Sequence, residues 1–423
     1  MGKQRQISKI VVEATRYLLA IVLLFSGFVK SIDPVGGGLK MVEYMLALGM
    51  PAFRPYATIF AVLLSSFEFM IGALLLMGLW RKLTAWLVLV FMSFMTLISL
   101  YLALFNPITD CGCFGDAIHL TNWQTFSKNI PLLLASILYC IGYNYIHPLF
   151  KNTGAWIMTA LALFGILFLN YRSWQYLPIV DFRPFKVGNS LQSLILVPEN
   201  APQDEYDYTF IYEKGGEKRA FLMDSLPDES WQYVERHEKL IKKGYHPPVK
   251  DFSLFSEGRD ITDQILHNSG PMIWILSPDW QKADRGTAGR INRLYKTASA
   301  KGVLVFAISG SDQDNVERWR NATGAAYDNV LLDATTIKTI IRSNPGILFI
   351  ENGVIKAKVP GRGLPRSNAA MEQFVEHAFS SRHNVTMRAI VALTPLIAWL
   401  LAVLLALLIP ERNKKNAVII NKY

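Results

Sequence analysis

The chain has 423 residues, of which 51% are hydrophobic, and its mean hydropathy of +0.24 is too high for an ordinary soluble protein of this length. A formal net charge of +10 could indicate binding to nucleic acid. The basic residues, however, lie beside apolar segments, and the sequence has no separate basic patch with interleaved aromatic residues. We therefore expect membrane lipid, and no nucleic acid, as a partner.

Six apolar segments predict membrane-spanning helices, because about 20 apolar residues cross the hydrocarbon core of a bilayer. They cover approximately residues 17–29, 57–79, 83–105, 130–146, 155–169 and 389–409. The first follows a basic stretch, as in a signal peptide, but no small-residue cleavage site follows it, so we expect it to be retained. The sequence thus predicts a multi-pass membrane protein of about six transmembrane helices.

The basic residues next to these segments predict the topology, because Lys and Arg gather at the cytoplasmic ends of membrane helices. With six spans, all of them fall on one side of the membrane: Lys3, Arg5, Lys9, Arg81, Lys82, Lys151, Arg412, Lys414 and Lys415. We expect a bacterial inner (cytoplasmic) membrane with both termini in the cytoplasm. The long polar region and the 106–129 loop then lie on the periplasmic side.

Three charged residues lie within or beside the first two spans. Glu68 stands near the middle of the second span, where a carboxylate is costly and faces the bundle interior or a partner. It could contact a proton, a quinone or another small molecule, or it could be a structural hydrogen-bond acceptor toward a Ser or Tyr on a neighbouring helix. Arg16 and Lys30 bracket the first span; either could pair with a carboxylate, but snorkelling to the membrane interface is the favoured interpretation. Between these spans, Asp33-Pro34 and three glycines predict a turn, and residues 39–48 a short surface helix.

The stretch DCGCFGD, residues 110–116, places Cys111 and Cys113 just beyond the third span. The periplasm keeps disulfides oxidised, and Gly112 and Gly115 permit a tight turn. A disulfide across one intervening residue would be strained and therefore easily reduced, which favours a redox-active pair. The other interpretation is a compact membrane-proximal turn, with or without a permanent disulfide.

A metal site is a third hypothesis for this loop, with Cys111, Cys113, His119 and either Asp110 or Asp116 as ligands. Zinc and copper need three or four convergent ligands, and this spacing matches no standard site, so we expect no metal. The two aspartates are expected to raise the thiol pKa, since nearby negative charge disfavours the thiolate. That predicts a disulfide that a partner's thiolate attacks.

The polar region predicts an α/β domain that follows a small β-rich region. Alternating runs around Gly215-Gly216 indicate a β-hairpin within residues 171–245. From residue 246 strands alternate with helices and end in a hairpin. The expected domains are a membrane module over 1–170, a juxtamembrane β region over 171–245, a periplasmic α/β domain over 246–382 and a last transmembrane helix over 386–410.

The α/β domain resembles the thioredoxin-like fold. NPGILFIENGVIKAKV is similar to that fold's proline and final hairpin, and Pro345 stands where the family places a cis-proline facing its active site. KDFSLFSEGRDIT is similar to the start of the peroxiredoxin-like branch. After PMIWILS, however, the chain reads PDWQKAD and has no cysteine or CxxC. Because a thiolate is the nucleophile in that chemistry, the resemblance implies a docking module that cannot act alone.

The membrane part, residues 16–146, resembles the DoxX/MauE group of redox-associated membrane proteins. The resemblance rests on RYLLAIVLLFSGFVKSIDP, SSFEFMIGALLLMGLWRK and DCGCFGD followed by TNWQTFSKN. It implies a four-helix module tied to thiol or quinone redox processes beside a thioredoxin-like partner. The fusion to a cysteine-free thioredoxin-like domain is similar to that of Bacteroidetes DoxX-family proteins.

These features predict thiol-disulfide exchange or electron transfer through Cys111 and Cys113, as a component of a thiol-disulfide oxidoreductase. A periplasmic thioredoxin-like or client protein would dock on the α/β domain, with Asp110, Asp116 and Pro345 as binding residues. Glu68 would contact a proton or a quinone inside the bundle. A quinone is the one candidate cofactor. The alternative hypothesis is a non-catalytic scaffold or assembly factor that uses the α/β domain to bind an envelope protein.

Overall fold

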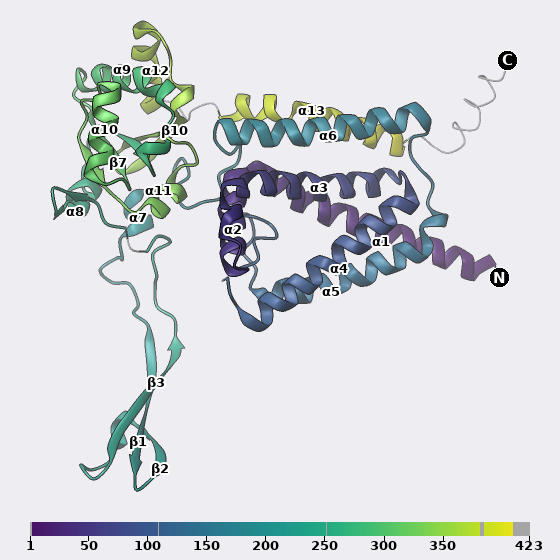
Figure 1. The fold of residues 1–423 in the computed structure, drawn as a ribbon, viewed down its shortest axis with the longest axis horizontal. Coiled ribbons are helices and arrows are strands. Elements are labelled where there is room, and N and C mark those ends of the chain that lie inside the picture. Colours follow the sequence, from purple (N-terminus) through teal and green to yellow (C-terminus); the bar gives the residue numbers. More distant parts are fainter. Residues whose placement is uncertain (1, 109, 251, 381–384, 409–423) are drawn as a thin grey trace.

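The computed structural model describes residues 2–108, 110–250, 252–380 and 385–408, and it contains a helical bundle and two β-sheets (Figure 1). The expected domain ends at residues 381–382 and 409–410 lie outside the described residues, as do Arg412, Lys414 and Lys415.

Six helices within the described residues are long and apolar enough to cross a membrane, which confirms the predicted number of spans. They are α1 (Gly2–Ile32), α3 (Ala57–Met77), α4 (Arg81–Phe105), α5 (Asn122–Gly142), α6 (Asn152–Gln175) and α13 (Val385–Leu408). They pack as antiparallel pairs, α1 with α3, α4 with α5 and α6 with α13 (Figure 1). The expected domain boundary after residue 170 falls inside α6.

Helices α1 and α3 approach each other closely because glycines lie at their contact. A Cβ added at Gly27 of α1 would lie 2.5 Å from the backbone nitrogen of Phe69 in α3. A Cβ added at Gly72 of α3 would lie 2.7 Å from the backbone nitrogen of Leu24 in α1. Small residues at such contacts let membrane helices pack backbone to backbone. This contact brings Ser26 and Lys30 of α1 against Glu68 of α3, whose side chain is buried.

A surface helix, α2 (Pro34–Ala47), joins α1 to the short 3₁₀ helix η1 (Pro51–Tyr56). The predicted turn is confined to Asp33, the one non-helical residue between α1 and α2, and the prediction is wrong for Pro34 and the three glycines, which are helical. Asp33 is the N-cap, and its carboxylate accepts from the Gly36 amide at 2.8 Å, while Pro34 takes the first helical position, where no intrahelical N–H is needed. The glycines remain helical because α2 packs on α3: a Cβ at Gly38 would lie 2.5 Å from the hydroxyl of Thr58.

The larger sheet has seven strands in the order β10-β9-β6-β7-β8-β4-β5. Their bounds are β4 (Phe255–Ser256), β5 (Arg259–Asp260), β6 (Met272–Ser277), β7 (Leu304–Ser309), β8 (Asn329–Leu331), β9 (Gly346–Glu351) and β10 (Val354–Pro360). Strands β6, β7 and β8 are parallel, and β9 is antiparallel to β6. We call the part of the chain that packs around this sheet the sheet domain.

Helices cover both faces of this sheet. One face packs against α9 (Ala288–Ser299), α10 (Gln313–Thr323) and α12 (Asn368–Ser380), and the other against α7 (Leu191–Ile195), α8 (Thr262–Leu266) and α11 (Ala334–Ile340). Successive residues of β6 alternate between the two hydrophobic cores, as the period of a strand requires: Ile273 faces the first and Trp274 the second. Phe185 and Leu191 join the second core, so this part of the expected 171–245 region packs with the sheet domain.

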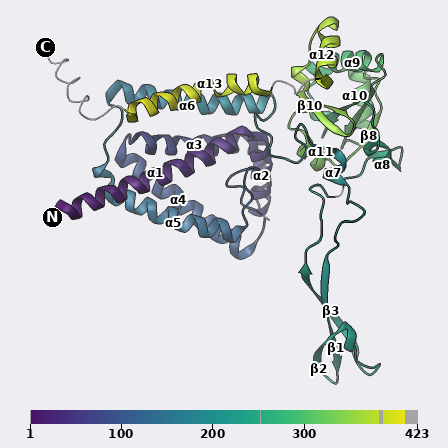
Figure 2. The same cartoon turned by 180° about the vertical axis from the view of Figure 1, so that it is seen from behind.

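A separate three-stranded antiparallel sheet forms an arm of residues 205–242, with strand order β2-β1-β3. Its strands are β1 (Glu205–Lys214), β2 (Glu217–Leu222) and β3 (Gln232–Lys242), and the turn at Gly215-Gly216 confirms the predicted hairpin. The arm extends away from the sheet domain and the helices in both views (Figure 1, Figure 2).

Candidate functional site

The cysteine loop, residues 110–116, folds into a tight turn that brings its two sulfurs together. The Sγ atoms of Cys111 and Cys113 lie 2.8 Å apart, both cysteines are free thiols, and they are 6% and 7% exposed. Gly112 and Gly115 have φ of +64° and +53°, in the left-handed region that a residue with a side chain rarely adopts. The loop geometry therefore depends on the two glycines, as the sequence predicts.

Helix α2 covers the outer side of the cysteine loop. The Tyr44 hydroxyl donates to the carbonyl of Cys111 at 2.8 Å, and Lys40 pairs with Asp110 at 3.3 Å. The aliphatic part of Lys40 lies directly over Gly112, where an added Cβ would be 2.9 Å from its Cγ. The surface helix is thus packed on the sulfur pair.

An ion pair lies under the loop, between α1 and α3. The Lys30 Nζ contacts both carboxylate oxygens of Glu68, at 2.7 and 2.9 Å. The Ser26 Oγ lies 2.8 Å from Glu68 Oε2 and 2.8 Å from the carbonyl of Cys113, and its single proton is donated to one of them at a time. Ser26 therefore connects the ion pair to the cysteine loop.

The favoured interpretation of two basic residues, snorkelling, is wrong, and the alternative, pairing with a carboxylate, holds for both: Lys30 pairs with Glu68 and Arg16 with Glu13. Lys30 does not snorkel, because its ammonium is paired with Glu68 inside the bundle. Arg16 is 3% exposed and donates to the carbonyls of Leu75 and Leu76 at the end of α3. Both side chains therefore join helices to one another instead of reaching for the membrane interface.

The two thiols have different acidities. The pKa of Cys111 is lowered to about 6, chiefly because the Cys113 thiol donates a hydrogen bond to its sulfur, and also because Lys30 and Lys128 lie nearby. The same hydrogen bond and burial raise the pKa of Cys113 well above its usual value. The geometry therefore supplies one thiolate, on Cys111, and one protonated thiol, on Cys113.

The prediction that the flanking aspartates raise the thiol pKa is wrong for Cys111. Asp110 is paired with Lys40 at 3.3 Å, and Asp116 with Arg342 at 3.2 Å. Their negative charges are compensated by these cations, so the aspartates do not prevent a thiolate on Cys111.

Arg342 of the sheet domain reaches into the membrane part. Its Nε contacts Asp33 Oδ2 at 2.8 Å, its Nη2 contacts Asp116 Oδ2 at 3.2 Å, and its Nη1 donates to the carbonyl of Lys338 at 2.8 Å. The side chain is 6% exposed. One arginine thus joins the sheet domain, the N-cap of α2 and the end of the cysteine loop.

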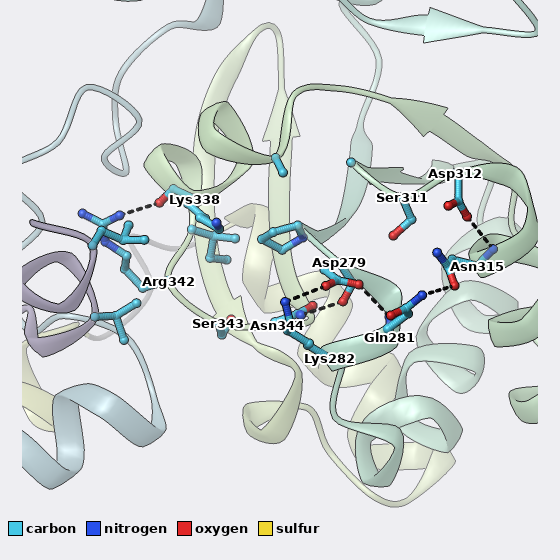
Figure 3. A pocket seen from close by; sticks show the side chains of 16 residues that line it. Asp279, Gln281, Lys282, Ser311, Asp312, Asn315, Lys338, Arg342, Ser343 and Asn344 are labelled. Carbon is cyan, nitrogen blue, oxygen red and sulfur yellow. Dashed lines mark hydrogen bonds and ion pairs between the residues drawn. The ribbon is translucent and has the colours of Figure 1, made fainter. Parts of the chain in front are cut away.

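A pocket of about 510 Å³ opens beside Arg342, between α2 and the carboxyl ends of β6 and β7 (Figure 3). Its lining combines both parts of the chain: Val35 and Leu39 of α2 with Asp279, Gln281, Ser311, Asn315, Lys338, Arg342, Ser343 and Asn344, among others. Polar side chains predominate on the sheet-domain wall (Figure 3). Crevices at the carboxyl ends of parallel strands are common ligand sites.

The structure brings most of the residues predicted from the sequence into one region. Asp110, Cys111, Cys113 and Asp116 share the loop, and Glu68 reaches it through Ser26. Pro345 follows a cis peptide bond in the sheet domain, next to Asn344 of the pocket wall. His119 is exposed, and the described residues hold no group of three or more His, Cys, Asp or Glu side chains that could bind a metal ion.

Four residues of this region are assigned no role there by the sequence: Ser26, Tyr44, Lys128 and Arg342. A signal exists for Ser26, because it lies four residues before Lys30 and shares a face of the first span with it. Arg342 gives no such signal, since its partner Asp33 is 309 residues away in the chain.

The fold and the site define a multi-pass membrane protein in which a cysteine loop lies between a helical bundle and a sheet domain. Residues 8–142, which contain most of α1, all of α2 to α5 and the cysteine loop, match the family model described as methylamine utilisation protein MauE. This part of the chain is thus similar to a MauE-family membrane domain. Residues 206–243, the arm, match a domain of unknown function, DUF8463. A search of curated proteins found no match.

Proposed function

We propose that this MauE-like membrane protein exchanges disulfides with a polypeptide partner through Cys111 and Cys113. The observation that carries the proposal is the sulfur pair itself, 2.8 Å apart, with the pKa of Cys111 lowered and that of Cys113 raised. A thiolate is the nucleophile of thiol chemistry, and a second thiol beside it completes a two-electron couple.

The exchange proceeds in two balanced steps. The Cys111 thiolate attacks a disulfide of the partner, which forms a mixed disulfide and releases one partner thiolate. Cys113 then gives up its proton to the released thiolate and attacks the Cys111 sulfur. The Cys111–Cys113 disulfide forms, the second partner thiolate leaves, and two electrons have passed to the partner. The reverse sequence oxidises a partner dithiol.

The direction is set by the acidity of Cys111. A lowered thiol pKa stabilises the reduced pair, and a couple whose reduced form is stabilised is a stronger oxidant. We infer that the Cys111–Cys113 disulfide is consumed by partner dithiols. The partner protein is then left with the newly formed disulfide.

The sheet domain is proposed to be thioredoxin-like and to dock the partner. Its strand order, with three parallel strands, an antiparallel final hairpin and helices on both faces, supports this fold. The pocket at the ends of β6 and β7 supports a docking role, because it lies where the fold would carry its own cysteine. Asp279 and Gln281 take that place here, so the reacting sulfur would come from the cysteine loop.

Glu68 is proposed to be a positioning residue. Its carboxylate accepts hydrogen bonds from Lys30 and Ser26 and so holds both side chains beside the cysteine loop. The residues present do not fit a quinone at Glu68, since Lys30 and Ser26 occupy both carboxylate oxygens and the side chain is 1% exposed. We therefore derive no step through a quinone.

The proposed location is the inner membrane, with the sheet domain and the cysteine loop in the periplasm. The start of α1, the α3–α4 turn and the α5–α6 connection lie at the end of the bundle remote from the sheet domain (Figure 1). Arg81, Lys82 and Lys151 are at that end, and the preference of basic residues for the cytoplasm supports this orientation.

A trapping experiment tests the exchange. Cys113→Ser cannot form the Cys111–Cys113 disulfide, so a Cys111 thiolate that attacks the disulfide of an oxidised partner stays in the mixed disulfide. This adduct should accumulate in native membranes and disappear on reduction. Cys111→Ser is the matched control and should trap less, because the thiol with the lowered pKa is gone. If neither variant yields a reducible adduct, the proposal fails.

The alternative function, a non-catalytic scaffold, is favoured by a different observation. The arm exposes large apolar side chains, among them Leu222, Met223 and Tyr233, at 56%, 65% and 57%. Such surfaces mark interaction sites. A stoichiometric partner that still copurifies with the double variant Cys111→Ser/Cys113→Ser, and is lost when the arm is removed, would support the scaffold.

A further inference from the structure

The cysteine pair is covered by α2, which conflicts with any reaction with a partner protein. Both cysteines are less than a tenth exposed, and Tyr44 and Lys40 of α2 lie over them. A partner disulfide cannot reach a buried sulfur without displacing the cover. The structure therefore describes a closed state of the site.

One residue of the sheet domain links the start of the cover to the cysteine loop. Arg342 holds Asp33, which is the N-cap of α2, and it holds Asp116 at the far end of the cysteine loop. A displacement that carries the start of α2 away from the loop separates Asp33 from Asp116 and breaks at least one of these charged contacts. Hydrogen bonds to charged groups are stronger than neutral ones, so this contact resists opening.

The pocket beside Arg342 has two walls, one formed by α2 and the other by the sheet domain. Val35 and Leu39, on the first turns of α2, line that pocket together with Arg342. A polypeptide bound there would touch the cover and its fastening residue at once.

We propose that α2 is a movable cover over Cys111 and Cys113 that Arg342 locks, so that a polypeptide partner must release this lock before disulfide exchange. The inference rests on the proposed function, because the access it controls is access to the redox pair. The cover moves as one unit with Tyr44 and Lys40.

Arg183 provides a matched control for Arg342. Like Arg342, Arg183 donates a hydrogen bond to the carbonyl of Lys338. Its side chain is also 6% exposed. Its other hydrogen bonds go to Asp181 and Thr339. Loss of Arg183 should therefore disturb packing near α11 without releasing α2.

The test measures access to the reduced cysteines in the full-length protein in detergent. The rate of labelling of Cys111 and Cys113 by a polymer-tagged maleimide is compared with the rate for iodoacetamide. Arg342→Met should raise the maleimide rate by about tenfold or more, the factor expected for loss of a charged hydrogen bond. Arg342→Lys should give a rate between those of the wild type and Arg342→Met, because one ammonium keeps the charge but cannot make both contacts of the guanidinium. Asp33→Asn should raise the rate by a smaller factor than Arg342→Met.

Two results would overturn the proposal. One is an unchanged maleimide rate in Arg342→Met, and the other is an equal rise in Arg183→Met, which would indicate general loosening of the domain contact. If Arg342→Met does not fold, the maleimide rate of Asp33→Asn is the test, because this variant leaves the Arg342 side chain intact and weakens only its contact with Asp33. Because labelling needs no partner, this outcome is independent of whether Cys113→Ser traps a mixed disulfide.

Discussion

Lys30 on α1 and Glu68 on α3 form an ion pair inside the helical bundle, with the ammonium 2.7 and 2.9 Å from the two carboxylate oxygens. Ser26, one turn before Lys30, joins this pair to the backbone of Cys113. A buried ion pair adds little stability by itself, but removing one partner leaves an uncompensated charge.

Single substitutions in this ion pair should be more damaging than the double substitution. Lys30→Met or Glu68→Gln should each lower the free energy of unfolding in detergent, Lys30→Met by about 3–5 kcal/mol because it leaves a buried carboxylate unpaired. The double variant Lys30→Met/Glu68→Gln should recover a large part of that loss. Additive losses in this cycle, measured by thermal denaturation, would show that the two side chains do not interact.

The acidity of Cys111 predicts the pH dependence of alkylation. Because only the thiolate reacts and the pKa is lowered to about 6, the rate at Cys111 should rise through pH 6 and level off above it. Cys113, whose pKa is raised, should react slowly until the solution is strongly alkaline. Fragment-ion mass spectrometry of the alkylated loop distinguishes the two sites.

A control variant shows the cause of that shift. Cys113→Ala removes the thiol that donates to the Cys111 sulfur, so the Cys111 profile should move to higher pH. Lys128→Met should move it in the same direction by less, because the contribution of Lys128 to the lowered pKa is smaller. A Cys111 profile that stays unchanged in Cys113→Ala would contradict the proposed hydrogen bond between the thiols.

Local sequence patterns predict much of this architecture. The six spans, the hairpin at Gly215-Gly216 and the tight turn at Gly112 follow from apolar runs and from glycine, which depend on neighbouring residues only. Long-range contacts are different. The partners of Lys30 and Arg342 are 38 and 309 residues away, and they are set by helix packing and by the placing of the sheet domain on α2.

Long-range contacts also explain why two predictions near the cysteine loop are wrong: the turn at the glycines after Asp33 and the effect of Asp116 on the thiol pKa. Asp-Pro followed by three glycines predicts a turn, but packing on α3 keeps those glycines helical and leaves only Asp33 outside the helices. Asp116 was expected to raise a thiol pKa because a sequence shows a charge but not its partner, which here is Arg342. Short-range rules fail at both positions because tertiary contacts decide them.

Filling the pocket should block a protein partner but not a small reagent. Gln281 is exposed, lines the pocket and lies on the sheet-domain wall, away from the cysteines. Gln281→Trp should reduce formation of the mixed disulfide in the Cys113→Ser background and leave iodoacetamide labelling of Cys111 unchanged. Gln281→Ala is the matched control. Equal trapping in the Trp and Ala variants would exclude this pocket as the docking site.

The arm should be dispensable for the chemistry of the cysteines. Its three strands pair with one another and extend away from the bundle (Figure 2). Replacing residues 206–241 by a short Gly/Ser linker should leave the pH profile of Cys111 unchanged. If the deletion instead shifts that profile, the arm contributes to the site. Loss of a copurifying protein with an unchanged profile would assign partner binding to the arm.

The redox state of Cys111 and Cys113 in native membranes tests the central claim most directly. Cells are quenched with acid, free thiols are tagged, and the mass of the cysteine loop shows whether the pair is a dithiol or a disulfide. We predict that both forms are present and that their ratio shifts between oxidising and reducing growth conditions. A pair that stays in one form under both conditions would contradict disulfide exchange by this protein.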